Sequence, residues 1–205
     1  MRVKTELKRQ AILDVAGKVF LEMGYQRASM GEISARLGGS KATLYSYYDS
    51  KQALFFDFIQ TTIAPLIEPA FSELTHGVDD VSKTLIAFGK QLMHTLCMPQ
   101  FIAARRIVIA ESDHTDIGER FYNDGPKKGH EKVVAFISAA IEAGKLRHTD
   151  ANIASRHLHA LLHAETLNQY IFCLNAEISP KLIDESVERA IEVFMSAYGL
   201  KSNLK

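Results

Sequence analysis

The stretch 29–51, SMGEISARLGGSKATLYSYYDSK, constrains the fold of this chain more than any other segment. Ser29 and Glu32 have the spacing of a capping box, in which a hydroxyl and a carboxylate satisfy two backbone N–H groups. A helix is therefore expected to begin here. The pair Gly38-Gly39 can adopt the positive φ that ends such a helix and turns the chain.

A second cap, Ser40, then begins a short helix over 41–47. Its one strongly apolar inward residue is Leu44, and a helix of this length is not stable in isolation. Neighbouring elements must hold it in place, which predicts a helix-turn-helix. Its outward residues carry hydroxyl, phenol and amine groups, and these are the groups that reach phosphate oxygens and base edges.

The distribution of charge supports contact with phosphate at this end of the chain. The sequence has 24 Lys and Arg and 24 Asp and Glu residues, so its net charge is zero. Residues 1–51 hold nine of the basic and five of the acidic residues, a net +4, which leaves 15 and 19, a net −4, elsewhere. This asymmetry indicates a nucleic-acid partner, with a solvated charged face as the alternative. Lys4, Lys8 and Arg9 are placed to follow a DNA backbone.

These residues resemble the helix-turn-helix of the TetR family of transcriptional regulators. The family pattern is a small hydroxyl cap, Ile-Ala, Gly-x-Ser, x-x-Leu-Tyr-x-Tyr-Phe and then x-x-Lys. The matching residues are Ser29, Ile33, Ser34, Gly38, Gly39, Ser40, Thr43, Leu44, Tyr45, Ser46, Tyr47, Tyr48 and Lys51. The chain departs from the pattern at Gly39, where the family usually has an apolar residue, and at Gly31, where it often has a larger polar one.

The resemblance implies a ligand-responsive, homodimeric repressor that binds a palindromic operator in double-stranded DNA. It also implies release by a small apolar or amphipathic inducer. Phosphate contacts are implied for Tyr45, Tyr47 and Lys51, and positions near base edges for Lys41, Ala42 and Thr43. The expected DNA-binding residues are Ser29, Ser40, Lys41, Ala42, Thr43, Tyr45, Ser46, Tyr47 and Lys51. The alternative within this class is a regulator controlled by a protein partner, or an activator.

The rest of the chain is also predicted to be helical, because apolar residues recur at helical spacing and no stretch shows strand alternation. We expect an all-α fold of about nine helices, with a helix-turn-helix DNA-binding domain over 1–50 and a ligand-binding and dimerisation domain over 51–205. The helix before the motif should end at Gly24, and the helix capped by Ser50 should leave the motif without a break. Residues 151–174 should form one helix that is buried on two faces. The segments RRIVIAES, ERFYNDGPKK and AGKL resemble the ligand domain of AcrR-like TetR regulators.

A ligand site and a dimer interface are predicted in the second domain. The expected ligand-binding residues are Phe58, Met93, Phe101, Arg105, Ile109, Phe136 and Tyr170. Arg105 and Arg106 lie in an otherwise apolar helix, where an unpaired buried guanidinium is costly. One of the two is therefore expected to turn inward and meet either an acid, Glu111 or Glu165, or a ligand. The last two helices carry much apolar surface and are expected to pair across a two-fold axis. The expected interface residues are Leu158, Leu162, Val187, Ile191 and Phe194.

Three histidines crowd one predicted helix, at His157, His159 and His163. His159 and His163 are four residues apart, as metal ligands on a helix are, which gives an alternative from another class: a helical metal-binding or interaction protein. A third ligand at suitable spacing is missing, so neither a metal nor another cofactor is expected.

The sequence lacks a Gly-rich phosphate loop, a nucleophile elbow, HExxH and Cys-x-x-Cys, so we do not expect an enzyme. Cys97 and Cys173 lie in apolar helical patterns and are expected to be reduced, buried thiols. We expect a cytoplasmic protein, because no apolar run approaches the length of a membrane span and the N-terminus lacks the apolar core of a signal peptide.

Overall fold

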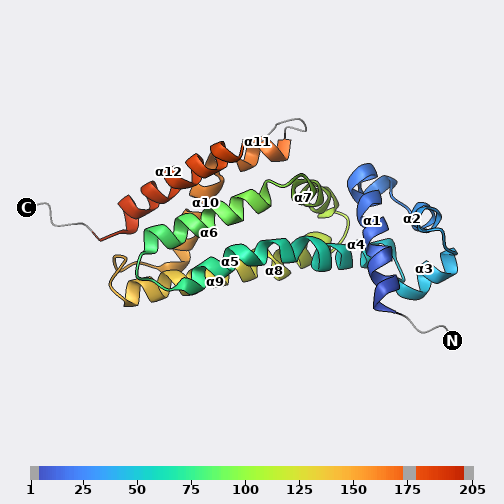
Figure 1. The fold of residues 1–205 in the computed structure, drawn as a ribbon, viewed down its shortest axis with the longest axis horizontal. Coiled ribbons are helices and arrows are strands. Elements are labelled where there is room, and N and C mark those ends of the chain that lie inside the picture. The colour runs from blue at the N-terminus through green and yellow to red at the C-terminus, as the bar shows by residue number, and fades with distance from the viewer. Residues whose placement is uncertain (1–4, 173–178, 201–205) are drawn as a thin grey trace, which may run out of the picture. The chain divides into compact units, whose positions relative to one another are not determined.

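The computed structural model describes residues 5–172 and 179–200, and these form an all-α fold, as predicted (Figure 1). Within residues 5–172 and 179–200, pairing of β type is limited to one isolated bridge, Leu146 with Gly199. No helix in the described ranges is both long and apolar enough to cross a membrane. The α-helices are α1 Glu6–Arg27, α2 Met30–Leu37, α3 Lys41–Tyr47, α4 Lys51–Phe58, α5 Glu68–Glu73, α6 Val81–Leu96, α7 Pro99–Glu111, α8 Ile117–Asp124, α9 Pro126–Glu142, α10 Ala151–Ala164, α11 Leu167–Phe172 and α12 Pro180–Tyr198.

The chain divides into two compact units. The first consists of Met1–Leu66 with Ala103–Glu119, and the second of Ile67–Ile102 with Arg120–Lys205. The first unit therefore holds the helix-turn-helix together with α4 and most of α7. Helix α7 begins in the second unit and ends in the first.

The core of the first unit is the apolar stripe of α1, which packs on α2 and α4. Leu44 and Tyr48 are buried, as expected for the residues that fix α3 to this core. Gly17 lets α4 approach α1 closely, because a Cβ at Gly17 would overlap the ring of Phe58. Aromatic rings of Phe20, Phe55 and Phe58 then pack together at centroid distances between 5.0 and 6.5 Å.

The predicted end of α1 at Gly24 is visible as a kink rather than a stop. Gly24 has φ 75°, and one further helical turn follows before the helix ends at Arg27. The helix capped by Ser50 leaves the motif without a break, as predicted, but its winding changes to a π-helix at Ile59–Ile63 and to a 3-10 helix at Ala64–Ile67. Pro65 explains the change, because proline has no N–H and its ring collides with a carbonyl one turn earlier in a regular α-helix.

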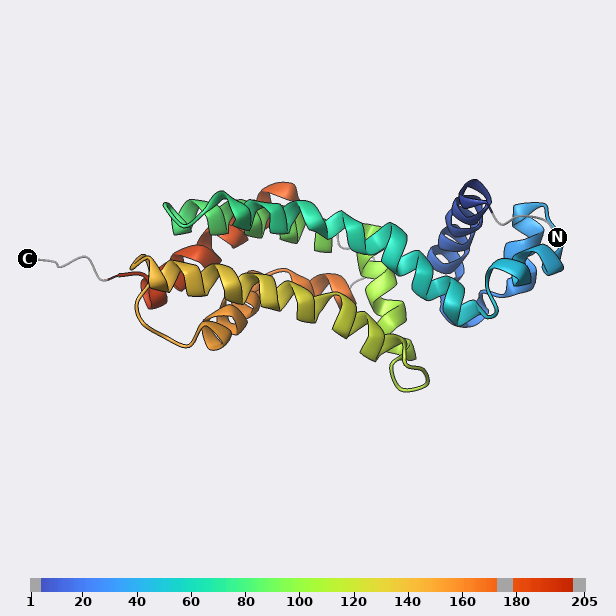
Figure 2. The same cartoon turned by 90° about the horizontal axis from the view of Figure 1, so that it is seen from below.

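In the second unit, α6 packs on α5 and α12, and α10 packs on α9 and α12 (Figures 1 and 2). Helices α6 and α12 approach closely at Gly89, where a Cβ would lie 2.7 Å from Val187 Cγ1. The single helix predicted over 151–174 is interrupted after Ala164, and α11 begins at Leu167.

Candidate nucleic-acid interface

Local side-chain caps begin each helix of the motif. The Ser29 hydroxyl accepts a hydrogen bond from the Glu32 N–H at 3.1 Å, as the capping box predicts. The Glu32 carboxylate instead accepts from Arg36 Nε at 2.7 Å, so half of the box is formed. Ser40 and Ser50 accept from the N–H groups of Thr43 and Ala53 at 3.1 and 3.0 Å. These caps set where α2, α3 and α4 begin.

The turn between α2 and α3 is closed by a buried hydroxyl. Gly38 has φ 68° and supplies the left-handed conformation that ends α2. The Ser34 hydroxyl is buried and donates to the carbonyl of Gly39 at 2.8 Å. This hydrogen bond stabilises the turn, which lacks the apolar side chain that the TetR family usually has at the position of Gly39.

Helix α3 presents polar groups on its outer surface. Leu44 is fully buried and Thr43 is half-buried. The exposed residues of the helix and its cap are Ser40, Lys41, Ala42, Tyr45 and Ser46. Together with Thr43, these are six of the predicted DNA-binding residues, all on one short helix and its cap. Gly31 leaves room for the Lys41 side chain, because a Cβ there would lie 3.3 Å from Lys41 Cε.

Two residues that are predicted to contact phosphate also bind the protein itself. The Lys51 ammonium donates to the carbonyls of Tyr25 and Ala28 at 2.8 and 3.0 Å and lies 4.2 Å from the Tyr25 ring centroid. Burial lowers the pKa of Lys51, and the charge of Glu111 opposes that shift. The Tyr47 hydroxyl accepts from the N–H of Thr5 at 3.0 Å. Lys51 thus fixes the end of α1 to the start of α4.

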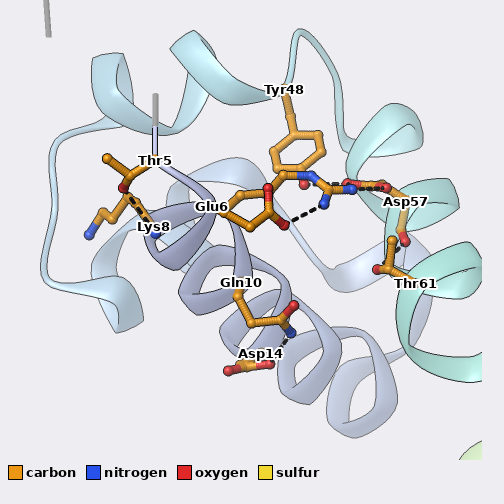
Figure 3. A network of polar contacts seen from close by, with 9 residues as sticks. Thr5, Glu6, Lys8, Gln10, Asp14, Tyr48, Asp57 and Thr61 are labelled. Atoms are coloured by element: carbon orange, nitrogen blue, oxygen red, sulfur yellow. Dashed lines mark hydrogen bonds and ion pairs between the residues drawn. The ribbon is translucent and has the colours of Figure 1, made fainter. Parts of the chain in front are cut away.

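Arg9 is also turned into the protein, in contrast to the expectation that it follows DNA. Its guanidinium donates to both carboxylate oxygens of Asp57 at 2.6 and 2.7 Å and to Glu6 at 2.8 Å. Asp57 also accepts from the Tyr48 hydroxyl (Figure 3). Burial and Asp57 raise the pKa of Tyr48. One carboxylate of α4 therefore holds both α1 and the end of α3.

Sequence reasoning missed Asp57, although a lone acid within the aromatic run FFDF was a usable signal. It overestimated the number of cations available to DNA. In the described part of residues 1–51, Lys8, Lys18 and Lys41 take part in no ion pair, whereas Arg9 and Arg36 are paired with acids. Lys4 lies outside the described residues. The unpaired lysines are the better candidates for phosphate.

The predicted ligand residues fall in both units. Phe58, Met93, Phe101 and Phe136 are buried, whereas Ile109 is 55% exposed. The Tyr170 side chain lies outside the described part of the chain. A pocket of about 320 Å³ in the second unit has a different lining, made by Glu73, His76, Gly77, Asp79, Asp80, Lys83 and Thr84.

The two acids proposed as partners for Arg105 or Arg106 have other contacts in the structure. Glu111 accepts instead from Gln26 at 2.7 Å, and Glu165 pairs with Arg189. Arg105 is half-buried, and burial lowers the pKa of its guanidinium.

The predicted dimer interface is corrected by burial within one chain. The five predicted interface residues are at most 2% exposed, because α10, α12 and α6 pack on one another. They are Leu158, Leu162, Val187, Ile191 and Phe194. A side chain with no exposed surface in the single chain cannot lose surface to a partner. These five residues therefore form the core of the second unit.

The histidines of α10 have different surroundings. His157 Nδ1 contacts the Tyr198 hydroxyl, and the rings of His159 and His163 lie 3.9 Å apart. Within residues 5–172 and 179–200, no three His, Cys, Asp or Glu side chains gather as metal ligands would. Cys97 is buried, which raises the pKa of its thiol to about 11, whereas Cys173 lies outside the described residues.

Comparison with known proteins defines the class. Residues 83–200 match the C-terminal domain of AefR-like transcriptional repressors, and residues 12–58 match the DNA-binding domain of bacterial regulatory proteins of the TetR family. The chain therefore belongs to the TetR family and is a transcriptional regulator. The matching C-terminal model is AefR-like, where the sequence suggested the AcrR-like branch.

Individual relatives agree with this assignment. The transcriptional activator FasR of Mycolicibacterium smegmatis is 35% identical over 79 residues, which cover 38% of this chain and only 36% of FasR. A putative TetR-family regulator from Mesorhizobium loti has a similar fold, with TM-score 0.87 and 22% identity over 97% of this chain and 100% of that one. The flavonoid-responsive regulator FrrA has TM-score 0.70 and 26% identity, covering 97% of this chain and 100% of its own.

Proposed function

We propose that this protein is a ligand-responsive, homodimeric transcriptional repressor that acts in the cytoplasm on a palindromic DNA operator. The observation that carries this is the outer surface of α3, where exposed hydroxyl, phenol and amine groups surround a buried Leu44. Such groups, presented at a helix N-terminus, bind phosphates and base edges. Thr43 and Lys41 are the base-reading candidates, and Lys8 is a phosphate candidate.

A symmetric dimer is supported by the surfaces of α10 and α12 that remain outside the core. Ile153 on α10 is 46% exposed, and Leu182 and Val193 on α12 are 39% and 53% exposed. Ala160 and Ala164 lie about two and three helical turns further along the same side of α10 and are exposed too. Two copies that join these faces make a four-helix interface. The operator half-sites are then about one helical turn, ~34 to 36 Å, or a multiple of it, apart.

The effector is proposed to be a small apolar or amphipathic molecule. Arg105 supports a polar or anionic group on it, because among residues 5–172 and 179–200 no acid is seen to pair with this half-buried guanidinium, and such a partner would offset the cost of burying it. The flavonoid response of FrrA supports an aromatic effector. A coupling free energy of about 1 to 3 kcal/mol weakens operator binding about 5- to 150-fold, and the operator weakens effector binding equally.

Activation is the second candidate, supported by the identity with FasR. One experiment separates the two. Duplexes that the purified protein selects from a random DNA pool are placed upstream of a promoter, and transcription is measured in vitro with and without the protein. Repression is expected; increased transcription supports the activator, and failure to select any duplex contradicts both.

A further inference from the structure

A buried acid ends helix α7 and has no part in the proposed DNA interface. Glu111 is 3% exposed, and both its carboxylate oxygens accept from Gln26 Nε2, at 2.7 and 2.9 Å. A buried carboxylate is costly unless it is hydrogen-bonded, so this contact is needed to keep Glu111 where it is. Gln26 lies in the last turn of α1, after the kink at Gly24.

The segment that Gln26 belongs to leads directly into the helix-turn-helix. Ser29, the cap of α2, follows Ala28, and the carbonyls of Tyr25 and Ala28 accept from Lys51 on α4. Residues 25–28 are thus held by a cation from α4 on the backbone and by an anion from α7 on the Gln26 side chain. The position of α2 depends on this segment, because no linker separates them.

We propose that Glu111 is a positioning residue for DNA binding, which holds residues 25–28 through Gln26 and so sets the position of α2. This inference rests on the proposed DNA-binding function. It gives α7 its own connection to the DNA-reading helices, separate from α4.

The sign of the effect separates positioning from simple electrostatics. Removal of an acid near a DNA-binding surface raises affinity for phosphate by electrostatics alone. Glu111→Gln is expected to lower it, because the hydrogen bond to a charged acceptor is lost and residues 25–28 are less well fixed. Asp113→Asn is the matched control: it removes the same charge from an exposed position two residues away.

The test measures affinity for one duplex that the wild-type full chain has selected from a random DNA pool. Glu111→Gln and Gln26→Ala are each expected to weaken binding on the order of five- to tenfold, and Asp113→Asn is not expected to weaken it. The double variant Gln26→Glu with Glu111→Gln, the exchange variant, swaps the two groups, so that the carboxylate lies at position 26 and the amide at position 111. It should return affinity to within about twofold of wild type. Thermal unfolding confirms that each variant is folded, and Gln26→Ala tests the contact from its exposed side if Glu111→Gln does not fold.

Loss in both single variants with recovery in the exchange supports the proposal. If the single variants bind DNA with wild-type affinity, the positioning role of Glu111 is overturned and the proposed DNA-binding function still stands. The same conclusion follows if the exchange variant binds as weakly as Glu111→Gln. A wild-type chain that selects no duplex overturns the proposed function and this inference together.

Discussion

Gly17 and Phe58 are in contact because Gly17 has no side chain: a Cβ there would lie 2.9 Å from Phe58 Cδ2 and closer still to the ring edge. The contact joins α1 to α4 at the level of the aromatic cluster. Ring atoms of a buried phenylalanine cannot move aside without shifting their neighbours.

We expect Gly17→Ala to lower the free energy of unfolding by up to about 2 kcal/mol. Overpacking costs ~1 to 3 kcal/mol and outweighs the helix propensity of alanine, which gains ~1 kcal/mol. Urea denaturation measures the change, and Lys18→Ala at the exposed neighbouring position is the control. A Gly17→Ala protein more stable than wild type would contradict the packing argument.

Tyr48 is expected to make stability fall at alkaline pH. Burial, followed by the hydrogen bond to Asp57, raises its pKa above the ordinary 10.0. The folded chain thus keeps the phenol protonated to a higher pH than the unfolded chain does. Its contribution to stability is complete below pH 10 and is lost as the pH rises through the folded pKa.

The measurement compares unfolding free energies of wild type and Tyr48→Phe over a series of pH values on either side of pH 10. The wild-type value should fall more steeply above pH 10 than that of the variant. Tyr45→Phe, at an exposed ring, should keep the wild-type slope. Equal slopes for wild type and Tyr48→Phe would argue against the role given to the hydroxyl.

Lys51→Ala is expected to destabilise the protein without altering the salt dependence of DNA binding. Its ammonium bonds two carbonyls, and hydrogen bonds to charged groups contribute ~1.5 to 3 kcal/mol. Lys8→Ala should instead leave stability unchanged and lower the slope of log affinity against log salt by about one. DNA titrations at several salt concentrations measure the slope for each variant. A slope that is reduced by Lys51→Ala would show that Lys51 contacts phosphate.

Thr43→Val should change sequence preference more than overall affinity. A lost base contact costs about 1 to 3 kcal/mol at the base pair concerned. Binding is measured on the selected duplex and on single-base variants of it. If Thr43→Val and Lys8→Ala lose affinity equally on every variant, Thr43 does not read a base.

Val193→Asp is expected to give folded monomers, whereas Ile191→Asp should fail to fold. The two positions are neighbours on α12, but Val193 is 53% exposed and Ile191 is fully buried. Sedimentation at micromolar concentration reports the assembly, and circular dichroism reports the helices. A Val193→Asp protein that stays dimeric would exclude this face of α12.

The sequence predicted well those features that depend on near neighbours. Ser29, Ser40 and Ser50 cap helices as expected, because each cap is a bond between residues three apart. It did not predict the intramolecular partners of Lys51 and Arg9, which come from helices distant in the sequence. Phe194 illustrates the same limit. The apolar stripe of α12 indicates that one face of this helix is buried, but the sequence does not indicate which element buries it.

The winding change from Ile59 to Ile67 has a geometric consequence. In a regular helix each residue turns the next side chain by about 100°, so one apolar stripe continues along the whole length. A π-helix advances each residue by less than this angle and a 3-10 helix by more, so the two departures between Ile59 and Ile67 act in opposite directions. The segment can therefore accommodate Pro65 with a smaller net rotation than either change of winding alone would give.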